Sequence, residues 1–192
     1  MYHKHYTKGI IIWGRAEDSD SRRIGIFTEH FGLISARAQG ARNAHSKFRP
    51  GVQDFSLGEF SMVHGKSGWR VVSARSFKNY FETFRNYPSK LKMVGNILNL
   101  VKRLVAEEKS ETPLFSIVVN FFDFLERAKE GEIALAEALT LARILHSLGY
   151  MSSDPELSLP LSSSEIQTED LDLIAPKRFK MIELINESLK AA

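Results

Sequence analysis

The sequence contains no cysteine and no long apolar run. The lack of cysteine excludes disulfide bonds, thiol nucleophiles and zinc sites built on thiolates. No apolar run approaches the roughly eighteen residues that cross a bilayer, and the N-terminal MYHKHYTKG lacks the continuous apolar core of a secretory signal. We therefore expect a cytoplasmic protein.

Catalytic and metal-binding patterns are also missing. The pentapeptide HGKSG at His64–Gly68 ends like a phosphate-binding P-loop, but Phe60 stands where that motif needs a glycine, and a strand pattern follows instead of a helix. His3 and His5 could present two imidazoles on one strand face, but no third ligand has a metal-like spacing. Since no nucleophile, base and oxyanion site can be assembled, we expect a protein that is not an enzyme and has no cofactor or metal.

Positive charge is concentrated in the first part of the chain. Residues 1–80 hold 13 Lys and Arg against 6 Asp and Glu, whereas residues 81–192 hold 13 against 17. Gly40–Arg49 carries three cations and His45 without one acid. This asymmetry favours nucleic acid as the partner of the first part, over a merely solvated basic loop. The cations that we predict to contact phosphate are Arg15, Arg22, Arg37, Arg42, Lys47, Arg49, Lys66 and Arg70.

Short strand patterns with turn signals between them fill residues 1–79. They lie at Gly9–Trp13, Arg23–Thr28, Leu33–Ala38, Phe55–Val63 and Trp69–Arg75. Five short strands predict a small closed barrel, OB-like or SH3-like. The aromatic residues Trp13, Phe48, Phe55, Phe60 and Trp69 are interleaved with the cations. Most must fill the barrel core, and we predict Phe48 and Trp69 as possible platforms for stacked bases.

Helical periodicity replaces the strand pattern after residue 79, which predicts an α+β protein with a helical bundle domain at residues 80–151. One helical pattern, Leu114–Leu125, is very apolar, and we interpret it as core in preference to a groove for a partner peptide. Residues 152–175 contain six acids and no Lys or Arg, so we expect a flexible or loosely docked segment there. Pro176 then opens a last helix at residues 176–192 that returns to the bundle.

The ordered set of these motifs resembles the RecO family of recombination mediators in bacterial DNA repair. The matching stretches, in order, are YTKGIIIWGR, IFTEHFGLISARAQGAR, SKFRPGVQDFSLGEF, PLFSIVVNFFDFLERAKEGE and LARILHSLGY. The resemblance implies an N-terminal OB barrel, a helical domain, and a nucleoid-associated protein that binds single- and double-stranded DNA and anneals complementary strands. It also implies partnership with RecR and with the C-terminal tail of single-stranded DNA-binding protein, and through them help in loading RecA.

Particular residues carry the resemblance. Gly40, Ala41 and Arg42 stand at the Lys-Gly-Ala-Arg turn of the family, and Ser46, Lys47 and Arg49 stand at its Ser-Lys-x-basic stretch. Arg22 falls on the basic residue of an Asp-Arg/Lys pair. Arg143 falls on the arginine before the Leu-Gly-Tyr helix end, and we predict that it binds a partner peptide together with Lys102 and Arg103.

The sequence also departs from the family pattern. Gln39 replaces the usual lysine of the turn and Ser21 the usual aspartate before Arg22. Many members carry a four-cysteine zinc module after Leu-Gly-Tyr, where this sequence has the acidic, cysteine-free residues 152–175. The chain therefore resembles a short, zinc-free member.

Two other functions fit the same residues. An RNA-binding, translation-associated barrel would use the same types of side chain. A protein-interaction adaptor would carry its basic charge only for solubility. Binding to DNA and RNA of equal length, and its dependence on salt, would distinguish these functions.

Overall fold

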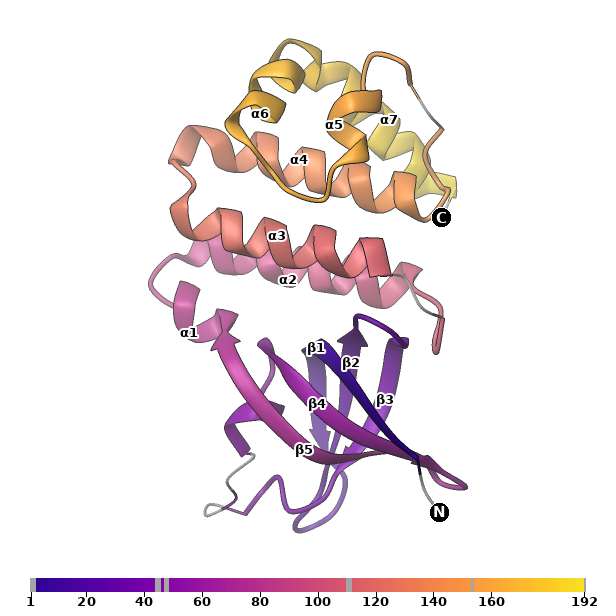
Figure 1. Cartoon of the computed structure of the whole chain (residues 1–192). Coiled ribbons are helices and arrows are strands. Elements are labelled where there is room, and N and C mark those ends of the chain that lie inside the picture. The colour runs from indigo at the N-terminus through magenta and orange to yellow at the C-terminus, as the bar shows by residue number, and fades with distance from the viewer. Residues whose placement is uncertain (1–2, 44–45, 47–48, 110–111, 153, 192) are drawn as a thin grey trace. The chain divides into compact units, whose positions relative to one another are not determined.

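A computed structural model describes residues 3–43, 46, 49–109, 112–152 and 154–191 (Figure 1). The chain divides into two compact units, Met1–Thr112 and Pro113–Ala192. Strands give way to helices between residues 79 and 80, where we expected a domain boundary, but the first two helices belong to the same compact unit as the strands. The division into compact units thus falls about thirty residues later than the change of pattern.

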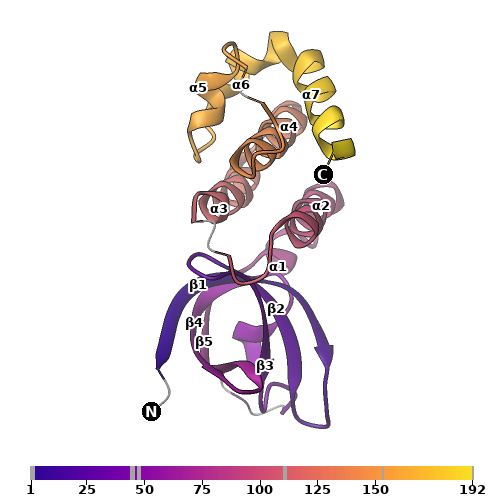
Figure 2. The same ribbon diagram turned by 90° about the vertical axis from the view of Figure 1, so that its right-hand side faces the viewer.

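The first unit contains a closed barrel in the strand order β1-β2-β3-β5-β4, which confirms the predicted fold class. The strands are β1 Lys4–Ala16, β2 Arg22–Thr28, β3 Gly32–Ala38, β4 Ser56–Gly65 and β5 Gly68–Asn79. Only β3 and β5 run parallel; the other neighbours are antiparallel. The strands curve round until β1 pairs with both β2 and β4 (Figure 2).

Alternating apolar residues build the barrel core, since successive side chains of a strand point to opposite faces. The buried cluster includes Ile11, Ile24, Ile26, Ile34, Phe60, Met62, Trp69 and Val71. The run Ile10-Ile11-Ile12 breaks the alternation, because the register of β1 shifts between Ile11 and Trp13. This irregularity lets all three isoleucines be buried and still returns Trp13 to the outer face.

Two helices follow the barrel within the first unit, α1 Tyr80–Phe84 and α2 Pro88–Leu104. Asn79 caps α1 by accepting a hydrogen bond from the backbone N–H of Glu82 (3.1 Å), and a proline begins α2. After α2 the chain returns to the barrel, where the backbone N–H of Glu108 donates to the carbonyl of Leu33 (3.1 Å). The end of α2 is therefore held beside β3.

The second unit is helical, and α5, α6 and α7 pack on α4. Its helices are α3 Thr112–Arg127, α4 Glu130–Ser147, α5 Ser158–Ser162, α6 Thr168–Ile174 and α7 Arg178–Ala191, with a 3-10 turn, Ala175–Lys177, before α7. The apolar side chains of Leu114–Leu125 are largely buried, which agrees with core and not with an open peptide groove. Among the described residues, every helix is too short or too polar to span a bilayer.

The acidic residues 152–175 differ from our expectation of a flexible, loosely docked segment. They form α5 and α6, and they bury Leu157, Leu161, Ile166, Leu171 and Ile174. Leu157 and Leu161 stand four residues apart and Leu171 and Ile174 three apart, which is the spacing of one helix face, and the burial of these side chains opposes the effect of the charge. The high content of acidic residues in this segment led to the expectation of flexibility, although its apolar residues are placed so that they can be buried.

Candidate nucleic-acid interface

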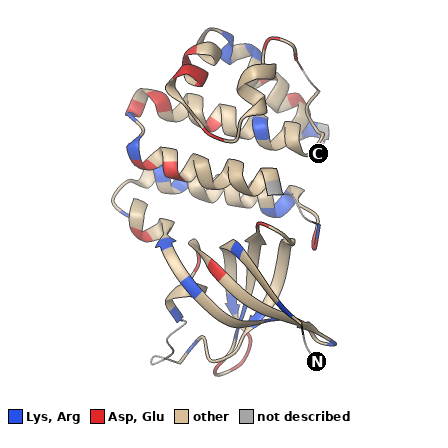
Figure 3. Cartoon of the chain, viewed as in Figure 1, with Lys and Arg blue, Asp and Glu red and all other residues tan. Residues whose placement is uncertain are grey.

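A row of four arginines crosses one face of the barrel. Arg15 on β1 lies opposite Arg23 on β2, Arg23 opposite Arg37 on β3, and Arg37 beside Arg70 on β5. Residues directly opposite in neighbouring strands share a face of the sheet, so these side chains form one line. With strands about 4.8 Å apart, the arginine row spans about 14 Å. Lys and Arg recur along the barrel strands in Figure 3.

Three members of the row, Arg15, Arg37 and Arg70, were predicted from the sequence to contact phosphate, whereas Arg23 was not. A signal was present in the sequence, because Arg22 and Arg23 are adjacent at the start of β2 and neighbouring side chains of a strand point to opposite faces. Only the strand order, which no local pattern fixes, shows that Arg23 stands between Arg15 and Arg37.

Two acids from the turn between β1 and β2 neutralise the middle of the arginine row. Glu17 pairs with Arg23 and lies 3.6 Å (Oε2 to Nε) from Arg37, and Asp18 lies 2.6 Å (Oδ2 to Nη2) from Arg37. Backbone N–H groups of Asp20 and Ser21 donate to Asp18 and hold its pKa below the ordinary value. Without these acids, like charges directly opposite one another would destabilise the sheet.

The ends of the arginine row are open. Arg15 and Arg70 are exposed, and within the part of the chain that the structure describes neither forms an ion pair with an acid. Both guanidinium groups can therefore meet a ligand phosphate without first losing a carboxylate.

Three further predicted arginines meet in a pocket of about 390 Å³, lined by Arg22, Arg42 and Arg49. Two hydrogen bonds hold the guanidinium group of Arg22 in place: Nη1 donates to the carbonyl of Val52 (2.7 Å) and Nη2 donates to the carboxylate of Asp54 (2.8 Å). Burial raises the pKa of Asp54, and the charge of Arg22 opposes that shift.

The other two arginines of this pocket are exposed. Arg42 donates from Nη1 to the carbonyl of Asp18 (2.5 Å), and Arg49 opens a 3-10 turn, Arg49–Val52. Of the remaining predicted residues, Lys66 is exposed in the turn between β4 and β5, whereas Lys47 and Phe48 lie outside the described residues. We call Arg22, Arg42 and Arg49 the arginine pocket.

The prediction that Trp69 stacks bases is wrong. Its side chain is 8% exposed, its Nε1 donates to Glu108 (3.0 Å), and its ring contacts those of His5, Phe31 and His64. Trp69 is a core residue because the inward phase of β5 begins with it.

The prediction that Arg143 binds a partner peptide also fails, because its side chain is completely buried. Its Nε donates to the carbonyl of Pro160 (2.7 Å), Nη1 to that of Glu165 (2.8 Å) and Nη2 to the carboxylate of Asp170 (3.0 Å). Burial lowers the pKa of Arg143, and Asp170 opposes the shift. Arg143 thus fastens α5 and α6 to α4.

Lys102 and Arg103, which we grouped with Arg143, are exposed near the end of α2 in the other compact unit. Arg143 therefore contributes no accessible cation to that group.

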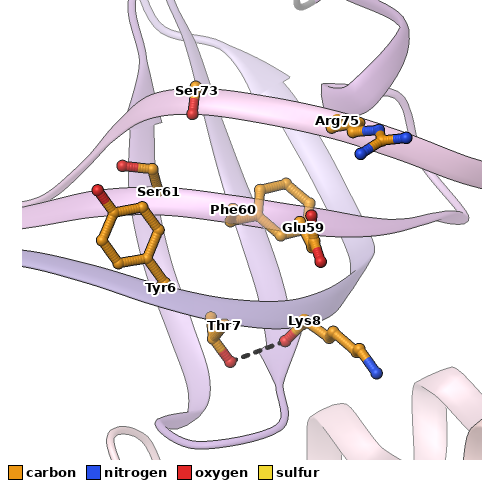
Figure 4. A pocket seen from close by; sticks show the side chains of 8 residues that line it. All are labelled: Tyr6, Thr7, Lys8, Glu59, Phe60, Ser61, Ser73 and Arg75. Carbon is orange, nitrogen blue, oxygen red and sulfur yellow. Dashed lines mark hydrogen bonds between the residues drawn. The ribbon is translucent and has the colours of Figure 1, made fainter.

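A second hollow, of about 520 Å³, lies across β1, β4 and β5 (Figure 4). Here Glu59 on the central strand stands between Lys8 and Arg75 in register. The alternating signs make this face a poorer match for a polyanion than the arginine row. Among the described residues, no three His, Asp or Glu side chains gather where a metal ion could bind.

A closed five-stranded barrel of this strand order defines the class of OB-like proteins, whose relatives commonly bind oligonucleotides. Residues 1–80 match the family model described as "Recombination protein O N terminal". These residues therefore carry the N-terminal domain of the RecO family.

Several relatives, each named DNA repair protein RecO, support this assignment. The protein of Synechocystis sp. is 30% identical over 81% of this chain and 56% of its own length. That of Alkaliphilus metalliredigens is 28% identical over 83% and 63%, and that of Acetivibrio thermocellus 26% identical over 75% and 57%. The chain thus matches about three fifths of the length of these relatives.

Proposed function

We propose that this chain binds DNA and that it acts in DNA repair, which is the role that the names of its relatives give for them. The observation that carries the proposal is the arginine row Arg15, Arg23, Arg37 and Arg70. The arginine row is about 14 Å long, which is the axial length of about four phosphates of one strand spaced 3.4 Å along a duplex. Its ends, Arg15 and Arg70, pair with no acid among the described residues and are the charges that can meet these phosphates.

The arginine row and the arginine pocket support annealing without a nucleotide cofactor. Cations that neutralise phosphates of two strands lower the repulsion between the strands, so complementary bases can meet. This mechanism needs positioned charge and no bond-making step, so we propose a non-enzymatic mediator.

The partners RecR, the tail of single-stranded DNA-binding protein and, indirectly, RecA belong to the same proposal and rest on the family relationship. Since Arg143 is buried, the cations left for an acidic partner peptide are Lys102 and Arg103.

The salt dependence of DNA binding tests this proposal. Fluorescence anisotropy of a labelled single-stranded oligonucleotide would compare the wild type with Arg15→Ala/Arg70→Ala and Arg42→Ala/Arg49→Ala. Each phosphate contact that is lost should flatten the log-log salt slope by about 0.7. The matched control Arg85→Ala/Lys92→Ala removes the same charge from exposed positions of the same unit.

We expect both arginine pairs to lose slope, affinity and annealing while the control stays near wild type. Equal losses in all three variants would mean that only net charge matters, and would refute the assignment of these arginines. Tighter binding to RNA than to DNA of equal length would overturn DNA as the partner.

A further inference from the structure

Beside the arginine row lies a cavity of about 610 Å³ that contains an outward-facing tryptophan. Trp13 on β1 is half-buried, and Lys102 of α2 and Val105 line the same cavity within the first unit. Trp13 is one of the aromatic residues interleaved with the cations, but Trp69 and Phe48 were the two predicted from the sequence to stack bases.

The indole of Trp13 lies flat on a glycine of the neighbouring strand. Gly25 is opposite Trp13 in the β1–β2 register, and a Cβ at Gly25 would come within 2.1 Å of the indole Nε1 and 2.4 Å of Cε2. Only a residue without a side chain lets the ring rest on the backbone here. One ring face is therefore supported by the sheet, and the ring borders the cavity with its other side.

Two cations lie over the indole ring. The guanidinium carbon of Arg15 and Nζ of Lys102 each lie 5.9 Å from the ring centroid. Cations at this distance are attracted to the ring and can hold the phosphates of a nucleotide whose base enters the cavity. Ser35 and Glu107 supply polar atoms on the cavity wall for the edge of a base.

The spacing between the cavity and the arginine row suits a nucleotide. Trp13 precedes Arg15 by two residues, so both point to the same face about 7 Å apart along β1. Trp13, Gly25 and Ser35 form a row parallel to that of Arg15, Arg23 and Arg37. One row can hold phosphates while the base of the same nucleotide reaches the other.

We propose that Trp13 is a stacking platform for one unpaired nucleobase, with Arg15 and Lys102 contacting the adjoining phosphates. This inference rests on the proposed function and adds to it a base-binding site that favours single strands. A paired base inside a duplex cannot expose its face to the indole, so the site acts on single-stranded or frayed DNA.

Intrinsic fluorescence tests the site without altering it. Trp69→Phe leaves Trp13 as the only tryptophan, since the sequence has two. We expect oligothymidylate to quench the fluorescence of this variant, and to leave that of Trp13→Phe, in which only the buried Trp69 emits, nearly unchanged. A saturating oligonucleotide that leaves Trp13 emission unaltered would refute the proposal.

An abasic oligonucleotide separates stacking from charge. Trp13→Leu should weaken oligothymidylate binding about 5- to 150-fold, as expected for one stacked base, and leave binding of an abasic chain of equal length unchanged. The control Phe77→Leu removes an exposed aromatic side chain that likewise has a cation over its ring, Arg75 at 5.8 Å, and should affect neither oligonucleotide.

Gly25→Ala supplies a second variant that leaves Trp13 in the sequence. Its Cβ must displace the indole, so it should reproduce the loss seen with Trp13→Leu and add nothing in that background. Circular dichroism would confirm that each variant is folded.

The two proposals fail in different ways. If the wild type binds neither the oligothymidylate nor the abasic chain, the proposed function is wrong. If it binds both equally and Trp13→Leu changes nothing, only the base site is wrong.

Discussion

Replacing the buried Arg143 should strongly destabilise the second unit. Arg143→Met keeps a long apolar stem but removes the charge and the donors to Pro160, Glu165 and Asp170. Two backbone carbonyls and a carboxylate would lose their partner, and each such buried acceptor costs about 1–3 kcal/mol. Breaking one side of a buried ion pair costs about 3–5 kcal/mol in total, and we expect a loss of that size.

Urea unfolding followed by far-UV circular dichroism would measure the effect of Arg143→Met. With an m-value of about 2 kcal/mol/M, the midpoint of the affected helical transition should fall by about 1.5–2.5 M. Arg143→Lys should lie between the wild type and Arg143→Met, because it keeps the charge but not the planar set of donors. The control Arg178→Met, at an exposed position of α7, should leave the midpoint unchanged.

An unchanged midpoint for Arg143→Met would contradict the buried network. If that variant instead kept its stability and lost affinity for a partner peptide, Arg143 would be a surface cation, as the sequence analysis predicted.

The acidic turn between β1 and β2 gives two more predictions. Glu17→Gln/Asp18→Asn should release Arg23 and Arg37 and so steepen the salt slope of single-stranded DNA binding by up to about 1.4, measured by anisotropy; a slope equal to that of the wild type would show that these arginines do not reach phosphate. Because the pKa of Asp18 is lowered in the folded protein, its carboxylate stabilises the fold above its unfolded pKa, and this contribution is lost as pH falls through the folded value. Thermal unfolding from neutral pH to below the ordinary aspartate pKa of 3.8 should therefore show a shallower acid loss for Asp18→Asn, and parallel curves would count against the linkage.

The barrel could be predicted from the sequence because each strand has a recognisable local pattern of apolar and polar residues. The alternation in Leu33–Ala38 predicts a strand, and the glycines around Lys66 predict a hairpin turn, whichever strands these segments pair with. The true length of β1 could not be predicted, because its last residues pair with the adjacent strand β2 but its first residues pair with β4, 47 to 59 residues further along the chain. Only the closed barrel brings both partners to one strand.

The environments of single side chains were harder to predict. Arg143 was expected at the surface because charged residues rarely enter a core unpaired, and its three acceptors lie 17 to 27 residues further along the chain. The sequence does not distinguish the environment of Trp13 from that of Trp69. Only the register shift in β1 places the side chain of Trp13 on the outer face of the barrel. Gly25 inside a strand was the overlooked signal, since such a glycine often marks a close approach.

The strand order also has a consequence for synthesis on the ribosome. β1 contains three consecutive isoleucines, and its pairing with β4 includes Lys4 with Val63. At about 5–20 residues per second, roughly 3–12 s separate the synthesis of these two residues, during which one edge of β1 has no partner strand. Arg70 is synthesised later still. The nascent chain therefore exposes an unpaired strand edge, which is prone to aggregation, before its arginine row is complete.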